Sequence, residues 1–218
     1  MNQFKNAFYK KISFDKDFSK NKNILSNKIC NYNVLIIGGA GTIGSSYIKQ
    51  ILKYKPSKIT VVDINENGLT ELTRDLRSSN LLDYNPEYIT YPVNLLSDTF
   101  DKIFNSELWQ VVANFSAHKH VRSEKDKISV EALIKNNVFG AIKLLNLCEL
   151  NPPKYFFSVS TDKAANPVNI MGASKSLMEK LILSKKNKFR VSTARFANVA
   201  FSNGSLLDGF IYRLNKKQ

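Results

Sequence analysis

The stretch NVLIIGGAGTIG, residues 33–44, decides the fold of this chain. It begins with a short apolar run, Val34–Ile37, of the kind that forms a central strand buried on both faces of a parallel sheet. A glycine-rich turn follows, and a helical stretch then continues to about Tyr54. This order of strand, glycine turn and helix is typical of a dinucleotide-binding unit; the alternative is a glycine-rich turn without a ligand.

The three spaced glycines of this turn have separate tasks in such a unit. Gly38 permits the tight turn, Gly41 lets the backbone approach a diphosphate, and Gly44 lets the helix pack closely on the strand. The first N–H groups of a helix lack partners within it and suit phosphate oxygens. We therefore expect these glycines, together with Thr42 and Ile43, to hold the diphosphate of a cofactor.

Apolar runs and helical stretches alternate along the rest of the chain. Strands are expected at 34–37, 58–62, 87–91, 110–115, 155–159 and 189–195. Helices are expected from the glycine turn to about 54, at 69–78, 99–104, 129–150 and 170–186, and from about 206 onward. This alternation predicts an α/β fold with a doubly wound parallel sheet.

An acidic residue ends the second predicted strand, in the place where it can select the cofactor. Asp63 lies 19 residues after Gly44. A carboxylate there accepts hydrogen bonds from the ribose hydroxyls of adenosine and would repel a 2′-phosphate. The position favours NAD over NADP, while Arg74 and Arg77 on the next helix leave NADP open.

The segment FFSVSTDKAANPVNIMGASK, residues 156–175, carries a second group of polar side chains. Thr161, Asp162 and Lys163 lie where the fifth strand gives way to a loop, and Lys175 lies on the helix after it. In an open parallel sheet, ligands bind at this carboxyl edge. A hydroxyl, a carboxyl and two amines there suit proton transfer. Taken alone, Asp162 and Lys163 would more readily form an ion pair in a surface turn, and their place in this motif at the carboxyl end of a strand reverses that preference.

The composition excludes several classes of protein. A chain of 218 residues with 43% hydrophobic and 23% charged residues is an ordinary globular domain with a sizeable core. Its net charge of +14 is unusual, but the basic residues form no long block and accompany no nucleic-acid motif. We therefore expect no nucleic-acid partner, and a positive field that attracts anionic, phosphate-bearing substrates.

The ends of the chain give weaker indications. Residues 1–30 form a basic, Lys-rich arm with spaced apolar residues. It is either a short helical arm that packs on the domain or on a partner, or a partly ordered extension; contact with a membrane surface is a third reading. The arm lacks the apolar core of a signal peptide, no run in the chain is long enough to span a membrane, and Cys30 and Cys148 suggest no disulfide. These features predict a cytoplasmic location.

Several motifs together resemble one branch of a known enzyme family, over about residues 33–218. The glycine spacing, Asn114–Ala117 and the helix Lys175 resemble the extended short-chain dehydrogenase/reductase family. The finer motifs are similar to its CapD-like polysaccharide biosynthesis branch, whose best-known members are UDP-N-acetylglucosamine 4,6-dehydratases. They are Lys119–Val121, Ser160–Ala164, Asn166–Pro167, Met171–Lys175 and Arg195–Val199.

The resemblance implies a Rossmann fold, an NAD or NADP cofactor and a nucleotide-sugar substrate. The cofactor would contact the glycine turn and further residues on the carboxyl edge, namely Asp63, Ser116, Ala117, Lys119 and Lys175. The substrate would contact Lys119, His120 and Asn198. We place an N-terminal arm at 1–30 and the NAD(P)-binding domain at 31–218, with the substrate-capping domain of such enzymes largely missing from this chain.

The resemblance also implies catalytic roles. In a 4,6-dehydratase a hydride leaves sugar C4, a base takes the C5 proton, an acid helps the C6 hydroxyl leave, and the hydride returns to C6. Asp162 would be the acid, Lys163 the base at C5, and Thr161 the donor to the C4 oxygen. Lys175 would hold the nicotinamide ribose and lower nearby pKa values by its charge. Asn137 matches a helix asparagine that orders a proton relay in the wider family.

Two positions depart from the wider family. Met171 stands where most members have a tyrosine four residues before the lysine, and a thioether exchanges no proton. Some members of the branch share this methionine, so the dehydratase prediction holds, but the base at C4 stays open between Lys163 and a water held by Thr161 and Lys175. Met171 itself could simply fill space beside the nicotinamide. The segment Tyr91–Asn94 lacks the acid that usually contacts adenine.

The sequence therefore predicts a lyase that converts UDP- or GDP-N-acetylglucosamine to the 4-keto-6-deoxy sugar for surface polysaccharide or nonulosonic acid synthesis. The alternatives are a nucleotide-sugar epimerase or reductase of the same fold, or a non-catalytic NAD(P)-binding fragment. A homo-oligomer is expected. No metal is expected, because His118 and His120 form a pair without a third ligand.

Overall fold

The computed structural model describes residues 14–119, 124–202 and 204–216. Its centre is a six-stranded sheet in the order β3-β2-β1-β4-β5-β6. The strands are β1 (Asn33–Ile37), β2 (Lys58–Val62), β3 (Glu87–Tyr91), β4 (Val111–Asn114), β5 (Tyr155–Thr161) and β6 (Arg190–Phe196). Every neighbouring pair is parallel, so the predicted doubly wound parallel sheet is confirmed.

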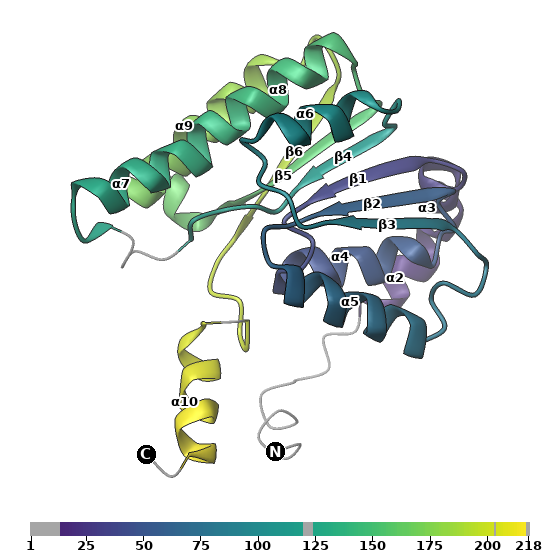
Figure 1. Ribbon diagram of the computed structural model, residues 1–218, viewed down its shortest axis with the longest axis horizontal. Coiled ribbons are helices and arrows are strands. Elements are labelled where there is room, and N and C mark those ends of the chain that lie inside the picture. The colour runs from purple at the N-terminus through teal and green to yellow at the C-terminus, as the bar shows by residue number, and fades with distance from the viewer. Residues whose placement is uncertain (1–13, 120–123, 203, 217–218) are drawn as a thin grey trace.

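Helices cover both faces of the sheet (Figure 1). The helices α4 (Thr42–Leu52) and α5 (Glu66–Ser78) lie on one face. The helices α6 (Asp98–Asn105), α8 (Gly140–Leu150) and α9 (Ile170–Ser184) lie on the other. Two short helices, α2 (Asp15–Lys20) and α3 (Lys22–Ile29), precede β1, and α10 (Leu206–Asn215) ends the described chain.

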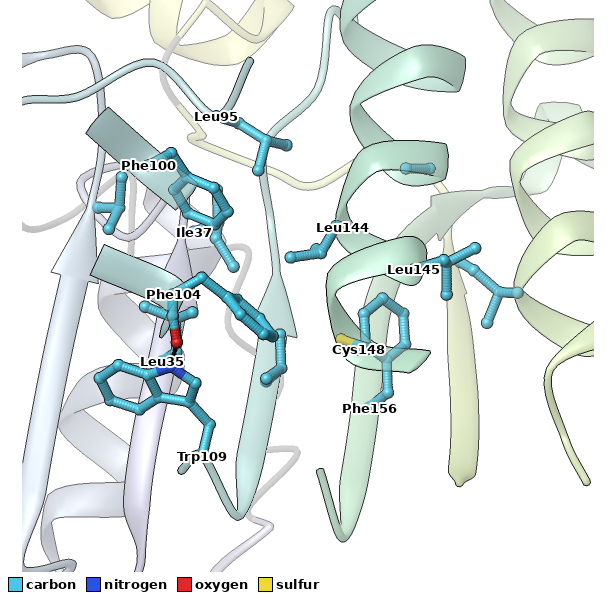
Figure 2. Packing of buried hydrophobic residues seen from close by; sticks show 14 of the residues in the cluster. Leu35, Ile37, Leu95, Phe100, Phe104, Trp109, Leu144, Leu145, Cys148 and Phe156 are labelled. Atoms are coloured by element: carbon cyan, nitrogen blue, oxygen red, sulfur yellow. Dashed lines mark hydrogen bonds between the residues drawn. The ribbon is translucent and has the colours of Figure 1, made fainter. Parts of the chain in front are cut away.

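The sheet separates two hydrophobic cores because its central strands are apolar on both faces. Leu35 and Ile37 of β1 face the α6–α8–α9 side, and Val34 and Ile36 face the α4–α5 side. Figure 2 shows the first core, in which Phe100, Phe104 and Trp109 pack against β1 and Phe156 packs beside α8. The Trp109 indole satisfies its N–H by donating to the Phe104 carbonyl over 2.8 Å.

The chain reverses its winding direction between β1 and β4. β1 pairs with β2 on one side and with β4 on the other. The crossover helices therefore diverge at this point and leave a crevice at the carboxyl ends of both strands, which is where ligands bind in open α/β sheets.

The structure corrects one predicted helix and defines part of the N-terminal arm. The helix expected over 129–150 is α7 (Lys127–Ile134), a π-helical segment η2 (Lys135–Phe139) and then α8. Within the arm, residues 15–29 form α2 and α3, and Ile29 packs against the core under β1 and β2. The arm's first 13 residues lie outside the described part, and the domain boundary at residue 30 stays a prediction. No helix of the described ranges is long and apolar enough to cross a membrane.

Candidate active site at the carboxyl edge of the sheet

The glycine turn is held by close backbone contacts on two sides. Gly38 has a φ of +75°, and a Cβ there would lie 2.5 Å from the Ser116 nitrogen. A Cβ on Gly44 would lie 2.4 Å from the Gly38 carbonyl oxygen. At Gly41, at the start of α4, the nearest atom would be 3.5 Å away, an ordinary van der Waals contact, so this position is not crowded. The turn thus exposes backbone beside free helix N–H groups, an arrangement that fits a diphosphate.

Asp63 joins this turn to the end of β2. One carboxylate oxygen accepts a hydrogen bond of 3.0 Å from the Ala40 N–H, and the other accepts one of 2.9 Å from the Asn65 N–H. The carboxylate retains further lone pairs for a ribose hydroxyl. Asp63 also lines a large cleft at this edge of the sheet.

A cleft with a volume of about 1000 Å³ runs along the carboxyl edge of the sheet. It brings together most of the predicted site residues from six separate segments. They are Gly38, Gly41, Thr42, Ile43, Gly44, Asp63, Ser116, Ala117, Lys119, Thr161, Lys163, Met171, Lys175 and Asn198. Asp162 does not line the cleft, and His120 lies outside the described residues.

The loop after β4 is fixed by two asparagines. The Asn114 side chain, 3% exposed, accepts a hydrogen bond of 3.0 Å from the Ser116 N–H. Asn137 accepts a hydrogen bond from the His118 N–H over 2.9 Å and donates one to the His118 carbonyl over 3.0 Å. Its amide thus pairs with both backbone groups of His118, as a neighbouring strand would. Residues 115–119 therefore keep a set course along the cleft wall.

Asn137 reaches this loop from the π-helical segment η2. A π-helical turn adds a residue to the helix and changes the direction in which its side chains point, and such turns are frequent at functional sites. From there the Asn137 amide also donates to the Ser174 hydroxyl over 3.1 Å, which links α9 to the β4 loop. The predicted relay asparagine is thus a buried cross-link between two walls of the cleft.

The Thr161–Lys163 segment forms a tight turn, η3 (Asp162–Ala164), at the end of β5. The Thr161 hydroxyl donates to an Asp162 oxygen over 2.9 Å, and the Lys163 ammonium lies 3.6 Å from the same oxygen. The hydroxyl hydrogen bond and the Lys163 charge hold the pKa of Asp162 below its ordinary value. Without substrate Asp162 is therefore a carboxylate, exposed on the rim rather than directed into the cleft.

Lys175 lies deeper, with only 3% of its surface exposed. Its ammonium donates to the Val159 carbonyl over 3.3 Å and contacts the Met178 sulfur at 3.5 Å. Burial lowers the pKa of Lys175 to about 8, and the charge of Glu179 raises it in part. A lysine whose pKa lies this close to neutrality can change its charge readily when a ligand binds.

Met171 lies on the cleft wall one helical turn before Lys175 and is 2% exposed. Its N–H donates to a Glu124 carboxylate oxygen over 2.7 Å, so an acid from the loop after β4 anchors the start of α9. Sequence reasoning missed Glu124, which lies 47 residues earlier and follows no recognisable spacing. It also missed the ion pair of the buried Glu179 with the half-exposed Arg195, although Glu179 follows Lys175 by one helical turn.

Within the described ranges no three histidine, cysteine or acidic side chains come together to hold a metal ion.

The remaining predicted contacts lie on loops: Lys119 after β4 and Asn198 after β6 both line the cleft. Phe196–Ala200 and the start of α10 also line the cleft.

The parallel sheet, the glycine turn at its switch point and the buried helix lysine define an extended short-chain dehydrogenase/reductase of the Rossmann fold. Residues 34–218 match the family described as "Polysaccharide biosynthesis protein", and the chain belongs to that family. The resemblance inferred from the sequence motifs is confirmed.

Three known proteins illustrate the relationship. The "Uncharacterized membrane protein MJ1061" of Methanocaldococcus jannaschii is 35% identical over 191 residues, which are 84% of this chain and 54% of the relative. A "UDP-N-acetylglucosamine 4,6-dehydratase (inverting)" of Campylobacter jejuni is 33% identical over 187 residues, 82% of this chain and 52% of the relative. The solved structure of Pen from Bacillus thuringiensis is 27% identical with a TM-score of 0.75, over 86% of this chain and 57% of that one. The chain thus spans about half the length of these relatives.

Proposed function

We propose that this protein is a nucleotide-sugar-modifying enzyme that uses NAD(P), and specifically a 4,6-dehydratase of UDP- or GDP-N-acetylglucosamine. The observation that carries the proposal is a single cleft lined by the glycine turn, Thr161, Lys163 and Lys175. A cofactor with its diphosphate at the turn would extend along the sheet edge toward these three side chains. The similarity to a Campylobacter jejuni dehydratase over 82% of this chain supports the same activity.

The residues of the turn suit the cofactor. The space at Gly41 admits a diphosphate oxygen, the first N–H groups of α4 face it, and Asp63 is placed for the adenosine ribose. Asp63 favours NAD over NADP, as the sequence predicts. When bound, the cofactor would accept a hydride from sugar C4 and later return it to C6.

The side chains of the chain itself would move the protons. The Thr161 hydroxyl would donate to the C4 oxygen, and Lys175 would contact the nicotinamide ribose. Lys163 would take the proton from C5, which the 4-keto group makes acidic. Asp162 would protonate the departing C6 hydroxyl after the substrate displaces its Thr161 hydrogen bond and raises its pKa.

Met171 supplies no proton in this scheme. Its buried thioether leaves the base at C4 to Lys163 or to a water held between Thr161 and Lys175. We therefore expect Met171→Leu, which nearly conserves volume, to keep turnover within about threefold. Lys175→Met should lower turnover by about a hundredfold or more, because it removes the buried charge.

The test is incubation with UDP- or GDP-N-acetylglucosamine and NAD⁺ or NADP⁺ in D₂O. A dehydratase forms a product lighter by one water, with deuterium at C5 and no accumulation of reduced cofactor. Lys163→Met should abolish deuterium incorporation, and Lys49→Met, on the outer surface of α4, serves as the control. Accumulating NADH or a 4-epimer would favour an epimerase or reductase, and cofactor binding without nucleotide-sugar binding would favour a non-catalytic module.

A further inference from the structure

A half-buried ion pair lies one helical turn after the helix lysine of the proposed site. Glu179, whose side chain is 7% exposed, lies one helical turn after Lys175 on α9. Arg195 of β6 holds it with three contacts: its Nε donates to the two carboxylate oxygens over 3.0 and 3.2 Å, and one Nη donates over 2.7 Å. A bidentate pair of this kind fixes both side chains and costs more to break when it is buried.

We propose that Glu179 and Arg195 are positioning residues that set the charge of Lys175 and tie it to the loop after β6. The inference rests on the proposed role of Lys175 in the cofactor site and adds what controls that lysine. Glu179 supplies the negative charge that helps keep the buried ammonium protonated. Arg195 holds this carboxylate in place through three hydrogen bonds.

The position of Arg195 gives the pair its second role. Arg195 is the next-to-last residue of β6, and Phe196–Ala200 directly after it line the cleft. By gripping Glu179, the arginine fixes where this loop leaves the sheet relative to α9. A movement of the loop on binding a nucleotide sugar would therefore change the geometry of the ion pair and, through Glu179, the charge of Lys175.

Other charged groups lie at the same edge of the sheet, and their effects on Lys175 must be distinguished from that of Glu179. Asp162 and Lys163 lie after β5, and His118 and Lys119 lie after β4. Asp162 pairs with Lys163 on the rim, whereas Glu179 is the carboxylate whose charge acts on Lys175. The variants used to test the inference leave these four residues unchanged.

Two substitutions should shift the titration of Lys175 in opposite directions. Glu179→Gln removes the negative charge and should lower the Lys175 pKa from about 8 by about one unit, because burial then acts unopposed. At pH 8 the charged fraction would fall from about a half to about a tenth. Arg195→Met removes a positive charge and frees the carboxylate, so it should raise the Lys175 pKa by about half a unit.

The measurement is a pH titration of the cofactor-free protein labelled with ¹³C at lysine Cε, followed by NMR. Lys175→Arg assigns the Lys175 signal. Glu149→Gln and Lys185→Met break a comparable ion pair of 2.9 Å between the ends of α8 and α9 and should leave the titration unchanged. Opposite shifts support the inference; shifts in one direction, or none beyond these controls, overturn it.

NADH affinity gives a second result. At pH 8, Glu179→Gln should weaken binding by about threefold to tenfold, and Glu179→Asp should restore part of it. Equal weakening by Glu179→Gln and Glu149→Gln would indicate a merely structural role and overturn the inference.

If the unaltered protein bound no NADH, the proposed function would fail, while the titration would still decide this inference. Arg195 is half-exposed, so its variant should fold even if the Glu179 variants do not.

Discussion

Gly41 and Gly44, in the turn after β1, are glycines for different reasons. A Cβ on Gly44 would meet the Gly38 carbonyl oxygen at 2.4 Å and the Gly39 Cα at 2.8 Å, so packing within the protein requires its absence. Gly41 has an ordinary φ of −72°, and a Cβ there would make only an ordinary van der Waals contact, at 3.5 Å from the Gly38 carbonyl oxygen. At the residue scale, one glycine thus serves the fold and the other serves the proposed ligand.

This difference predicts separable effects. Gly44→Ala should lower the free energy of unfolding by about 1–3 kcal/mol, because backbone atoms must move to admit the methyl group. Gly41→Ser should keep stability within about 0.5 kcal/mol, since serine is a favoured residue before a helix, yet weaken NADH binding by about tenfold or more. Urea denaturation and NADH fluorescence measure the two quantities. Equal losses of stability would contradict the assignment.

At the scale of elements, the π-helical segment between α7 and α8 decides how the cleft walls meet. It directs Asn137 to the backbone of His118 and to the hydroxyl of Ser174, so one buried amide joins the β4 loop to α9. The regular helix expected over 129–150 would carry this side chain in another direction. The interruption therefore links the local geometry of a helix to the shape of the site.

Removing this amide should loosen both walls. Asn137→Ala leaves the His118 N–H and carbonyl without their partner and should lower the free energy of unfolding by about 2 kcal/mol. NADH affinity should fall as well, because residues 115–119 lose their fixed course. The control is Asn136→Ala, whose side chain donates to Asn137 over 3.2 Å and should cost less than about 1 kcal/mol. Equal losses in the two variants, measured by urea denaturation, would argue against the cross-link.

At the scale of the whole molecule, the sheet separates two cores, and the proposed cofactor would lie along the sheet edge between them. The core under α4 and α5 supports the glycine turn, and the core under α6, α8 and α9 supports Lys175. The net charge of +14 gives the protein a positive field, which should favour the anionic ligands proposed for the cleft. Because such a field is screened within about 8 Å at physiological salt, it should act on binding at low ionic strength.

The field predicts a salt dependence. NADH affinity should fall by about threefold or more when salt rises from about 50 to about 300 mM, since screening weakens attraction to the diphosphate. Uncharged adenosine serves as the control ligand and should bind equally at both concentrations. If titration calorimetry finds NADH binding independent of salt, the excess positive charge of this protein has another use.

Most of the fold and much of the cleft could be predicted, and the reason is local. Strands β2 and β3 have the predicted bounds because each is a short apolar or β-branched run ended by turn residues. Parallel strands place their carboxyl ends on one edge, so Asp63, Ser116, Thr161 and Asn198 had to lie along the same edge once the strands were located. Asp162 shows the limit, because the turn of η3 directs it to the rim.

The sequence by itself determined the class of fold, the edge that carries the cleft and the family to which the chain belongs, because periodicity and motif spacing act over a few residues. Only the tertiary structure decided the π-helical insertion, the anchoring of α9 by Glu124 and the pairing of Glu179 with Arg195. Those features depend on contacts between segments 16–47 residues apart, and which polar groups meet there is settled by the packing of two cores against one sheet.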